Sequence, residues 1–194
     1  MSDLLKMASE ANARRYNADG QKGRNRNRRE VADLFPEAMA PEEIIDGDQR
    51  FTMRETDVWC RAKAGVDAWD LDVAACEESH LAEKFFTKAD DGLTKEWHGR
   101  VWCNPPFSDI GPWVRKANYQ AHTNAEVVAM LLPANRTEQA WWQQGIEDVR
   151  DRPGSILRTH FLPSRTRFGH PGNRDGIGVG SPPFGCVLLV WRRS

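Results

Sequence analysis

The sequence has no long apolar run. No stretch approaches the roughly 18 consecutive apolar residues of a membrane-spanning helix, and the opening residues, MSDLLKMASE, lack the apolar segment of a secretory signal. We therefore expect a cytoplasmic protein that makes no membrane contact.

Closely spaced metal ligands are also missing. The four cysteines lie far apart with no pair at C-x-x-C spacing, and the five histidines are scattered. Structural zinc sites draw their ligands from close pairs, so we expect no metal site. In a cytoplasmic protein these cysteines are predicted to be reduced, buried thiols.

The net charge is close to zero, because the chain has 27 basic and 28 acidic residues. This balance argues against a nonspecific nucleic-acid binder, but the charges are segregated. Residues 14–29 carry seven basic side chains against one acid, residues 152–174 carry five arginines and no acid, and residues 30–57 carry nine acids against two arginines. Such segregation allows one face to contact phosphate, although a solvated surface explains each basic patch equally well.

The composition permits one folded domain. Forty per cent of the residues are hydrophobic, and eight Trp and eight Phe are available for a core. The first 50 residues are instead poor in apolar side chains, first basic and rich in Asn and Gly, then acidic. We predict a partly flexible basic arm and an acidic linker over residues 1–50, and the folded domain over residues 51–194.

Short apolar runs that alternate with helical patterns predict an α/β fold. Strands are expected at residues 69–74, 100–103, 125–132, 155–162 and 184–191. Apolar residues at helical spacing predict a helix over 110–121, with Ser108 or Asp109 as its N-cap, and a rougher helical stripe over 140–149. Strands that are apolar along their length favour a mostly parallel sheet with helices on both faces. Ligands bind such sheets beyond the carboxyl ends of the strands.

The tetrapeptide Asn104-Pro105-Pro106-Phe107 is the strongest chemical signal. It follows an apolar strand directly and precedes a helix, which predicts a position in the ligand crevice. An aromatic amine is a poor nucleophile because its lone pair is delocalised into the ring. If the Asn104 side-chain oxygen and the Pro105 carbonyl each accept one amine hydrogen, the lone pair is free to attack a methyl group. The prolines hold the turn rigid, and Phe107 offers a flat face for a base removed from the duplex stack.

Two other interpretations of this pattern are open. A Pro-Pro pair after a strand is also typical of a plain rigid loop. A second polar-Pro-Pro-aromatic segment, Ser181-Pro182-Pro183-Phe184, suits methylation of the cytosine amine, but it precedes a strand. It would reach the crevice only if that last strand is antiparallel.

Several arginines are predicted in loops that follow strands. Arg136, Arg165 and Arg167, together with His170, are placed there by the predicted strands. Arginines in such loops contact phosphate or guanine edges, although they serve equally often as surface charges. We take the three arginines as candidates for nucleic-acid binding.

In these features the sequence resembles the small phage and prophage DNA N-6-adenine methyltransferases, from about Trp69 to Trp191. The most specific segment is residues 99–117, G-R-V-W-C-N-P-P-F-S-D-I-G-P-W-V-R-K-A. Weaker matches occur in the same order as in that family: Leu71–Ala75 (L-D-V-A-A), Asp90–Leu93 (D-D-G-L), Trp97, Leu131–Thr137 (L-L-P-A-N-R-T), Trp141-Trp142 and Arg165–Gly169 (R-T-R-F-G).

The resemblance implies a Rossmann-like methyltransferase sheet, S-adenosylmethionine as the methyl donor, and adenine in double-stranded DNA, with the target base flipped out, as the acceptor. Asp72 and Ala74 then correspond to the part of the chain that meets the methionine end of the donor, whose charge is cationic. Asp90 and Asp91 correspond to residues near its adenine or ribose, although Asp-Asp-Gly is equally a plain turn.

The chain departs from the family pattern at one place. The family usually has Thr-Pro near the start of the domain, whereas this chain has Glu55-Thr56-Asp57. How the carboxylate end of the donor is held is therefore open.

The acceptor also has alternatives. The same chemistry serves cytosine N-4, RNA adenine and protein glutamine, and a catalytically silent DNA-binding module is a rival from another class. The basic arm and the acid-free stretch favour a nucleic acid.

Overall fold

The computed structural model describes residues 50–169 and 182–193. The predicted basic arm and acidic linker lie outside these residues, apart from Arg50, so the division at residue 50 stays a prediction. His170 and Ser181 also lie outside the described residues.

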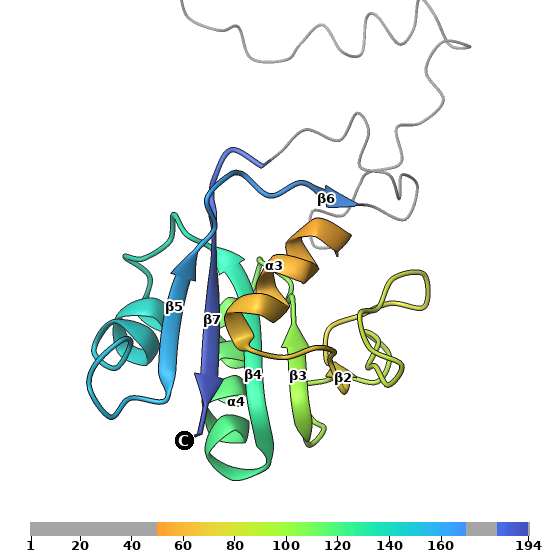
Figure 1. The fold of residues 1–194 in the computed structure, drawn as a ribbon, viewed down its shortest axis with the longest axis horizontal. Coiled ribbons are helices and arrows are strands. Elements are labelled where there is room, and N and C mark those ends of the chain that lie inside the picture. The colour runs from red at the N-terminus through yellow and green to blue at the C-terminus, as the bar shows by residue number, and fades with distance from the viewer. Residues whose placement is uncertain (1–49, 170–181, 194) are drawn as a thin grey trace, which may run out of the picture. The chain divides into compact units, whose positions relative to one another are not determined.

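A five-stranded sheet forms the centre of the described chain (Figure 1). Its strands are β2 (Leu71–Asp72), β3 (Gly99–Cys103), β4 (Ala125–Pro133), β5 (Leu157–Phe161) and β7 (Cys186–Arg192), in the order β2-β3-β4-β7-β5. The β2-β3 and β3-β4 pairs are parallel, whereas β7 runs antiparallel to both β4 and β5. The sheet is therefore mixed.

The predicted α/β class is confirmed, and every predicted strand is present with its ends shifted by a few residues at most. A mostly parallel sheet is not confirmed, because β7 is reversed between its two neighbours. All residues of β7 from Cys186 to Trp191 are buried. A central antiparallel strand that is covered on both faces has the same continuous apolar pattern as a parallel strand, so the pattern alone does not reveal strand direction.

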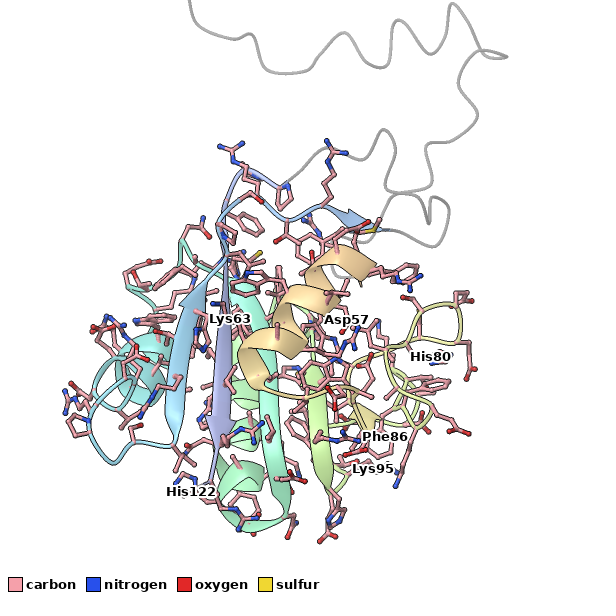
Figure 2. All side chains as sticks on the ribbon, viewed as in Figure 1. Asp57, Lys63, His80, Phe86, Lys95 and His122 are labelled. Atoms are coloured by element: carbon pink, nitrogen blue, oxygen red, sulfur yellow. The ribbon has the colours of Figure 1, made fainter. Side chains whose placement is uncertain are left out.

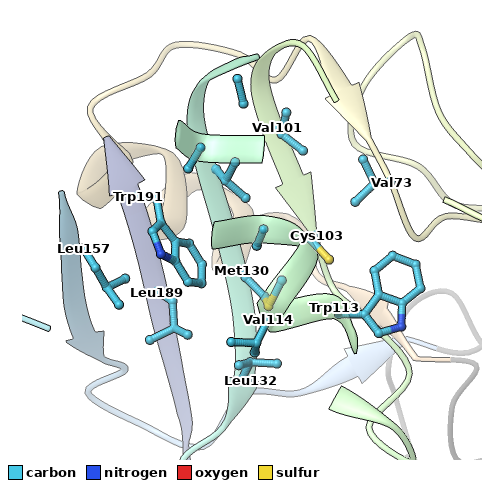
Figure 3. Packing of buried hydrophobic residues seen from close by; sticks show 14 of the residues in the cluster. Val73, Val101, Cys103, Trp113, Val114, Met130, Leu132, Leu157, Leu189 and Trp191 are labelled. Carbon is cyan, nitrogen blue, oxygen red and sulfur yellow. The ribbon is translucent and has the colours of Figure 1, made fainter. Parts of the chain in front are cut away.

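Helices cover both faces of the sheet. Alternate residues of a strand point to opposite faces, and those of β4 enter two separate cores. One core packs α4 (Ile110–Thr123) on Val128, Met130 and Leu132, and the other packs α3 (Arg54–Ala64) on Val127, Ala129 and Leu131. Figure 1 shows α3 in front of the sheet and α4 behind it, and Figure 3 shows the α4 core.

Helix α4 follows its predicted spacing. Ile110, Trp113, Val114, Ala117 and Ala121 are all buried against the sheet. Asp109 occupies the N-cap position, but its side chain makes no capping hydrogen bond. The second predicted helical stripe is realised as the short helix α5 (Ala140–Trp142) followed by a π-helical turn at Gln143–Glu147.

Helix α3 was not predicted, because one of its three buried residues is charged. Asp57, Cys60 and Ala64 recur at helical spacing, but the acid at Asp57 conceals the apolar pattern. The helix ends at Gly65, whose φ of 65° lies in the left-handed region where glycine is favoured.

A second, two-stranded sheet pairs β1 (Phe51–Thr52) with β6 (Phe168–Gly169) in antiparallel orientation. Strand β1 leads into α3, and β6 follows the segment that leaves the carboxyl end of β5. The pair therefore joins two distant parts of the chain beside that end of the main sheet.

Neither a membrane span nor a metal cluster is found in the part of the chain that the structure describes. No helix there is long and apolar enough to cross a membrane. No group of three His, Cys, Asp or Glu side chains over residues 50–169 and 182–193 could hold a metal ion. All four cysteines are free thiols, of which Cys60, Cys103 and Cys186 are buried and Cys76 is partly exposed.

The loop between β2 and β3 is held to the sheet by a close backbone contact. A Cβ atom on Gly92 would lie 2.2 Å from the Val73 carbonyl oxygen, and the Gly92 carbonyl accepts a hydrogen bond from the buried Trp97 indole at 2.8 Å. We expect Gly92→Ala to lower the free energy of unfolding by about 1–3 kcal/mol, as overpacking does, measured by urea denaturation. Gly185→Ala is the control, because no atom lies within 4 Å of its added Cβ. Equal stability of the two variants would contradict this packing.

Candidate functional site

The carboxyl edge of the main sheet gathers segments that are distant in the sequence. Asn104 to Phe107 leave β3 at this edge, and the parallel strands β2 and β4 end beside it. Because β7 is antiparallel, its first residue, Cys186, pairs with Pro133, the last residue of β4. The start of β7 is therefore at the same edge.

Asn104 is held by its amide nitrogen. Nδ2 donates a hydrogen bond of 2.8 Å to the main-chain carbonyl of Arg50, just before β1. A carbonyl oxygen only accepts, so this contact fixes which end of the amide faces Arg50. The amide oxygen must then point elsewhere.

The Asn104 side-chain oxygen is buried and has no hydrogen-bond partner in the structure. A buried acceptor without a partner costs free energy, about 1–3 kcal/mol, and such groups mark strained or functional positions. This oxygen is therefore available to an N–H group of a ligand.

Pro105, Pro106 and Phe107 complete a rigid, mostly covered turn. Pro105 is buried and Pro106 is partly exposed. The Phe107 side chain is only 8% exposed, and its ring lies at steep angles to the rings of Phe168 and Phe184, with centroids 6.0 and 6.2 Å away. Phe107 thus belongs to a three-ring cluster.

The second polar-Pro-Pro-aromatic segment reaches this edge as well. The last sheet strand is antiparallel, which is the condition under which this segment was expected to approach the crevice. Phe184 contacts Phe107 through the ring pair described above. Ser181, the polar residue of the segment, lies outside the described residues.

Arg136 contacts the turn from the loop after β4. It is half-buried, and its Nη1 donates a hydrogen bond of 2.6 Å to the Phe107 carbonyl. Arg165 and Arg167, the other two predicted DNA contacts, are exposed in the segment between β5 and β6.

Within the described residues, the acid-free stretch that starts at residue 152 has its arginines near both ends of β5. Arg152 and Arg158 lie at the start of β5, whereas Arg165 and Arg167 follow its end. A strand advances about 3.3 Å per residue, so β5 separates these two groups by more than 10 Å. Arg158 also turns back on its own loop and donates to the Ser155 carbonyl.

Asp72 ends β2 on the face of the sheet that α3 covers. Its register partner is Trp102, which packs in the α3 core. Two residues further along β3, Asn104 belongs to the same face by strand alternation. Strands lie about 4.8 Å apart, so this register sets the α-carbons of Asp72 and Asn104 about 8 Å apart.

The Asp72 carboxylate organises the loop that follows it. One oxygen accepts the Leu81 N–H at 3.0 Å and the other accepts the Ala74 N–H at 3.3 Å. The pKa of Asp72 is raised to about 6, mainly because the carboxyl group is buried. The two N–H bonds and His80 lower the pKa in part, and the charge of Asp57 raises it slightly. Figure 2 shows Asp57 on α3 and His80 in the loop after β2.

Ala74, Asp90 and Asp91 take part in local backbone structure. The Ala74 N–H donates to Asp72. Asp90 is exposed and accepts both the N–H and the hydroxyl of Thr87 at 2.8 Å. Asp91 has a φ of 53° and accepts the Leu93 N–H. These contacts are those of a turn, and a role of the pair toward a donor stays a prediction.

The structure adds contacts that sequence patterns did not indicate. Asp57 is buried and accepts hydrogen bonds from the Trp69 indole at 2.7 Å and from Arg61 at 3.0 Å. The Arg50 carbonyl holds Asn104. A main-chain carbonyl has no sequence signature, and the sequence marked Asp57 only as part of the Glu55-Thr56-Asp57 departure from the family pattern.

Comparisons with known proteins identify a family and two relatives. The family model for DNA N-6-adenine-methyltransferase (Dam) matches residues 46–174. The chain is 35% identical over 103 residues to a DNA N-6-adenine-methyltransferase of Escherichia phage T1, covering 52% of this chain and 41% of that protein. It is 31% identical over 84 residues to a DNA N-6-adenine-methyltransferase of Haemophilus phage HP1 (strain HP1c1), covering 43% and 48%. The matches thus span less than half the length of each relative.

The raised pKa of Asp72 predicts a definite pH dependence of stability. Because the folded pKa of about 6 exceeds the ordinary value of 3.8, the contribution of Asp72 to stability is largest below about pH 4 and falls as pH rises through 6. Two pKa units correspond to about 3 kcal/mol. Asp72→Asn is neutral at every pH, so we expect the free energy of unfolding to fall furthest below that of wild type near pH 4. By pH 7 this difference should be smaller by about 3 kcal/mol, because the wild type itself loses stability.

Urea denaturation of both proteins at a series of pH values checks this expectation. Asp70→Asn is the control, and its pH dependence should be the reverse. Hydrogen bonds from Arg100 lower the pKa of Asp70 to about 2, so the contribution of Asp70 to stability is lost as the pH falls. If the difference in stability between wild type and Asp72→Asn does not change with pH, Asp72 does not have a raised pKa.

Proposed function

Because the chain belongs to the DNA N-6-adenine-methyltransferase (Dam) family, we propose that it transfers a methyl group from S-adenosylmethionine to the N-6 amine of adenine in DNA. The observation that carries the proposal is the buried, unpartnered side-chain oxygen of Asn104. It lies in the turn at the carboxyl end of β3, and its amide is oriented by the Arg50 carbonyl.

The chemistry requires two acceptors and no strong base. The Asn104 oxygen accepts one hydrogen of the adenine amine, and the Pro105 carbonyl accepts the other. These bonds draw the nitrogen toward tetrahedral geometry and turn its lone pair away from the ring. The N–CH3 bond forms as the S–CH3 bond breaks, and the cationic amine then loses a proton to solvent, which leaves 6-methyladenine and S-adenosylhomocysteine. Positioning of this kind is worth about 7–11 kcal/mol.

The fit of S-adenosylmethionine is supported by Asp72. When bound, this donor supplies an electrophilic methyl group on a cationic sulfonium. Asp72 is a buried acid at the end of the strand next to Asn104, on the same face of the sheet. A carboxylate in that position stabilises a nearby cation. The turn at Asp90 and Asp91 is the further candidate for the adenosine part of the donor.

We assign the sheet to the Rossmann-like methyltransferase class. The support is that the candidate ligand-binding segments leave the carboxyl ends of adjacent parallel strands, β2 and β3, with helices on both faces. The reversed strand β7 is a variation within that arrangement.

The target base enters flipped out of double-stranded DNA. A base within the duplex stack cannot present its amine to a buried oxygen, so extrusion is required at Asn104. Phe107 is covered by Phe168 and Phe184, and a base that stacks on Phe107 must displace one of these rings. The exposed side chains of Arg165 and Arg167 are suited to contact the phosphate backbone beside the base.

The decisive test is methyl transfer to DNA by wild type and Asn104→Ala. The proteins are incubated with labelled S-adenosylmethionine and unmethylated duplex DNA, which is then digested to nucleosides. We expect label in 6-methyladenine and a rate about 100- to 1000-fold lower in the variant, the range for loss of one such polar contact. Asn118→Ala, an exposed asparagine of α4, is the matched control.

Other products would decide between the alternatives. Label in 4-methylcytosine that survives in Asn104→Ala would transfer the catalytic role to the Ser181 segment. Label in RNA or protein alone would replace the acceptor, and no transfer combined with intact DNA binding would favour the silent module.

Binding of the donor is expected to depend on pH through Asp72. Protonated Asp72 cannot stabilise a cation. The Kd for S-adenosylmethionine should therefore increase as the pH falls below 6, by up to about tenfold per pH unit, and should be constant above pH 6. Isothermal titration calorimetry from pH 5 to 8 measures this, and Asp72→Asn should bind more weakly with a flat profile. A wild-type affinity that does not change over this range would place the donor cation away from Asp72.

A further inference from the structure

We propose that Arg136 is a positioning residue that holds the Asn104–Phe107 turn in its reactive geometry, instead of a DNA contact as the sequence suggested. This inference rests on the function proposed above. It concerns the way in which the chain keeps one side-chain oxygen and one main-chain oxygen directed at the same amine.

The turn has few backbone donors with which to hold its own shape. Pro105 and Pro106 have no N–H groups, so half of the four residues cannot donate a main-chain bond. The helix that follows begins only at Ile110. Contacts from other parts of the chain therefore contribute to the orientation of the turn.

Two such contacts bracket the turn. At its start, Asn104 donates from Nδ2 to the Arg50 carbonyl. At its end, Arg136 donates from Nη1 to the Phe107 carbonyl at 2.6 Å. The two contacts come from residues 54 and 29 positions away in the sequence, so each ties the turn to a different segment of the fold.

The Arg136 contact is strong and well supported. A hydrogen bond from a charged guanidinium is shorter and about twice as strong as a neutral one. The loop that carries Arg136 is itself anchored, because the Ala134 N–H donates to the Gly185 carbonyl at 2.9 Å and the Gln139 N–H donates to the Arg136 carbonyl at 3.2 Å. The guanidinium therefore contacts the turn from a loop whose position is itself held by hydrogen bonds.

Burial separates Arg136 from the other two arginines. Arg165 and Arg167 are exposed, whereas Arg136 is half-buried with one donor committed to Phe107. Of these three arginines, Arg136 is the one whose geometry serves the turn.

Steady-state kinetics of Arg136→Ala and Arg136→Lys on duplex DNA test the proposal. We expect the kcat of Arg136→Ala to fall up to about 100-fold, the effect of a displacement of about 1 Å at a reacting group, with little change in the KM for DNA or for S-adenosylmethionine. Arg136→Lys keeps the charge and one donor, so it should recover part of the kcat. Arg152→Ala is the control, since Arg152 is 61% exposed at the start of β5, at the opposite edge of the sheet.

A second readout does not depend on activity. Carbonyl 13C labelling of phenylalanine reports the hydrogen bond at Phe107, and its signal should shift in Arg136→Ala while thermal unfolding shows that the variant is folded. If the alanine variant does not fold, the same signal is read in Arg136→Met, whose side chain has no N–H donor.

Two results would overturn the positioning role. One is an Arg136→Ala variant that retains kcat but binds DNA more weakly, with the slope of log affinity against log salt reduced by about one, as for a phosphate contact. The other is an unchanged Phe107 carbonyl signal. An inactive wild-type protein would instead contradict the proposed function, and the carbonyl signal would still decide whether Arg136 holds the turn.

Discussion

The hydrogen bond from the Asn104 side chain to the Arg50 carbonyl is the constraint on which the site depends. It assigns the donor end of the amide to the protein and leaves the acceptor end buried without a partner. Were the amide reversed, two carbonyl-type oxygens would face each other, which is unfavourable. The acceptor is thus prepared before any ligand arrives, and its unmet hydrogen bond is a cost that binding of an amine can relieve.

Strand direction brings the other parts of the site to this oxygen. The parallel pairing of β2 with β3 sets Asp72 beside the Asn104–Phe107 turn on one face of the sheet. The reversed strand β7 brings Phe184 to the same edge, where it packs on Phe107. A sheet with all strands parallel would have sent the start of β7 to the opposite edge. The mixed topology is therefore part of how the aromatic cluster at the site is built.

Much of this arrangement was predictable from sequence periodicity and residue chemistry. The main strands, helix α4 and the position of the Asn104 turn follow from apolar runs and helical spacing. The β1–β6 pair and α3 did not, because two-residue strands have no periodicity and a buried Asp57 interrupts the helical pattern. The direction of β7, the Arg50 carbonyl contact and the burial of Arg136 depend on tertiary packing.

The central claim is that the Asn104 oxygen, with its amide held by Arg50, receives the amine of the target base. A crystal structure of the protein with a duplex and a non-reactive donor analogue tests it most directly. The account predicts the N-6 nitrogen of a flipped adenine within about 2.7–3.2 Å of the Asn104 oxygen, while Nδ2 remains on the Arg50 carbonyl. An adenine amine bound elsewhere, or an Asn104 amide that has turned its nitrogen toward the base, would contradict it.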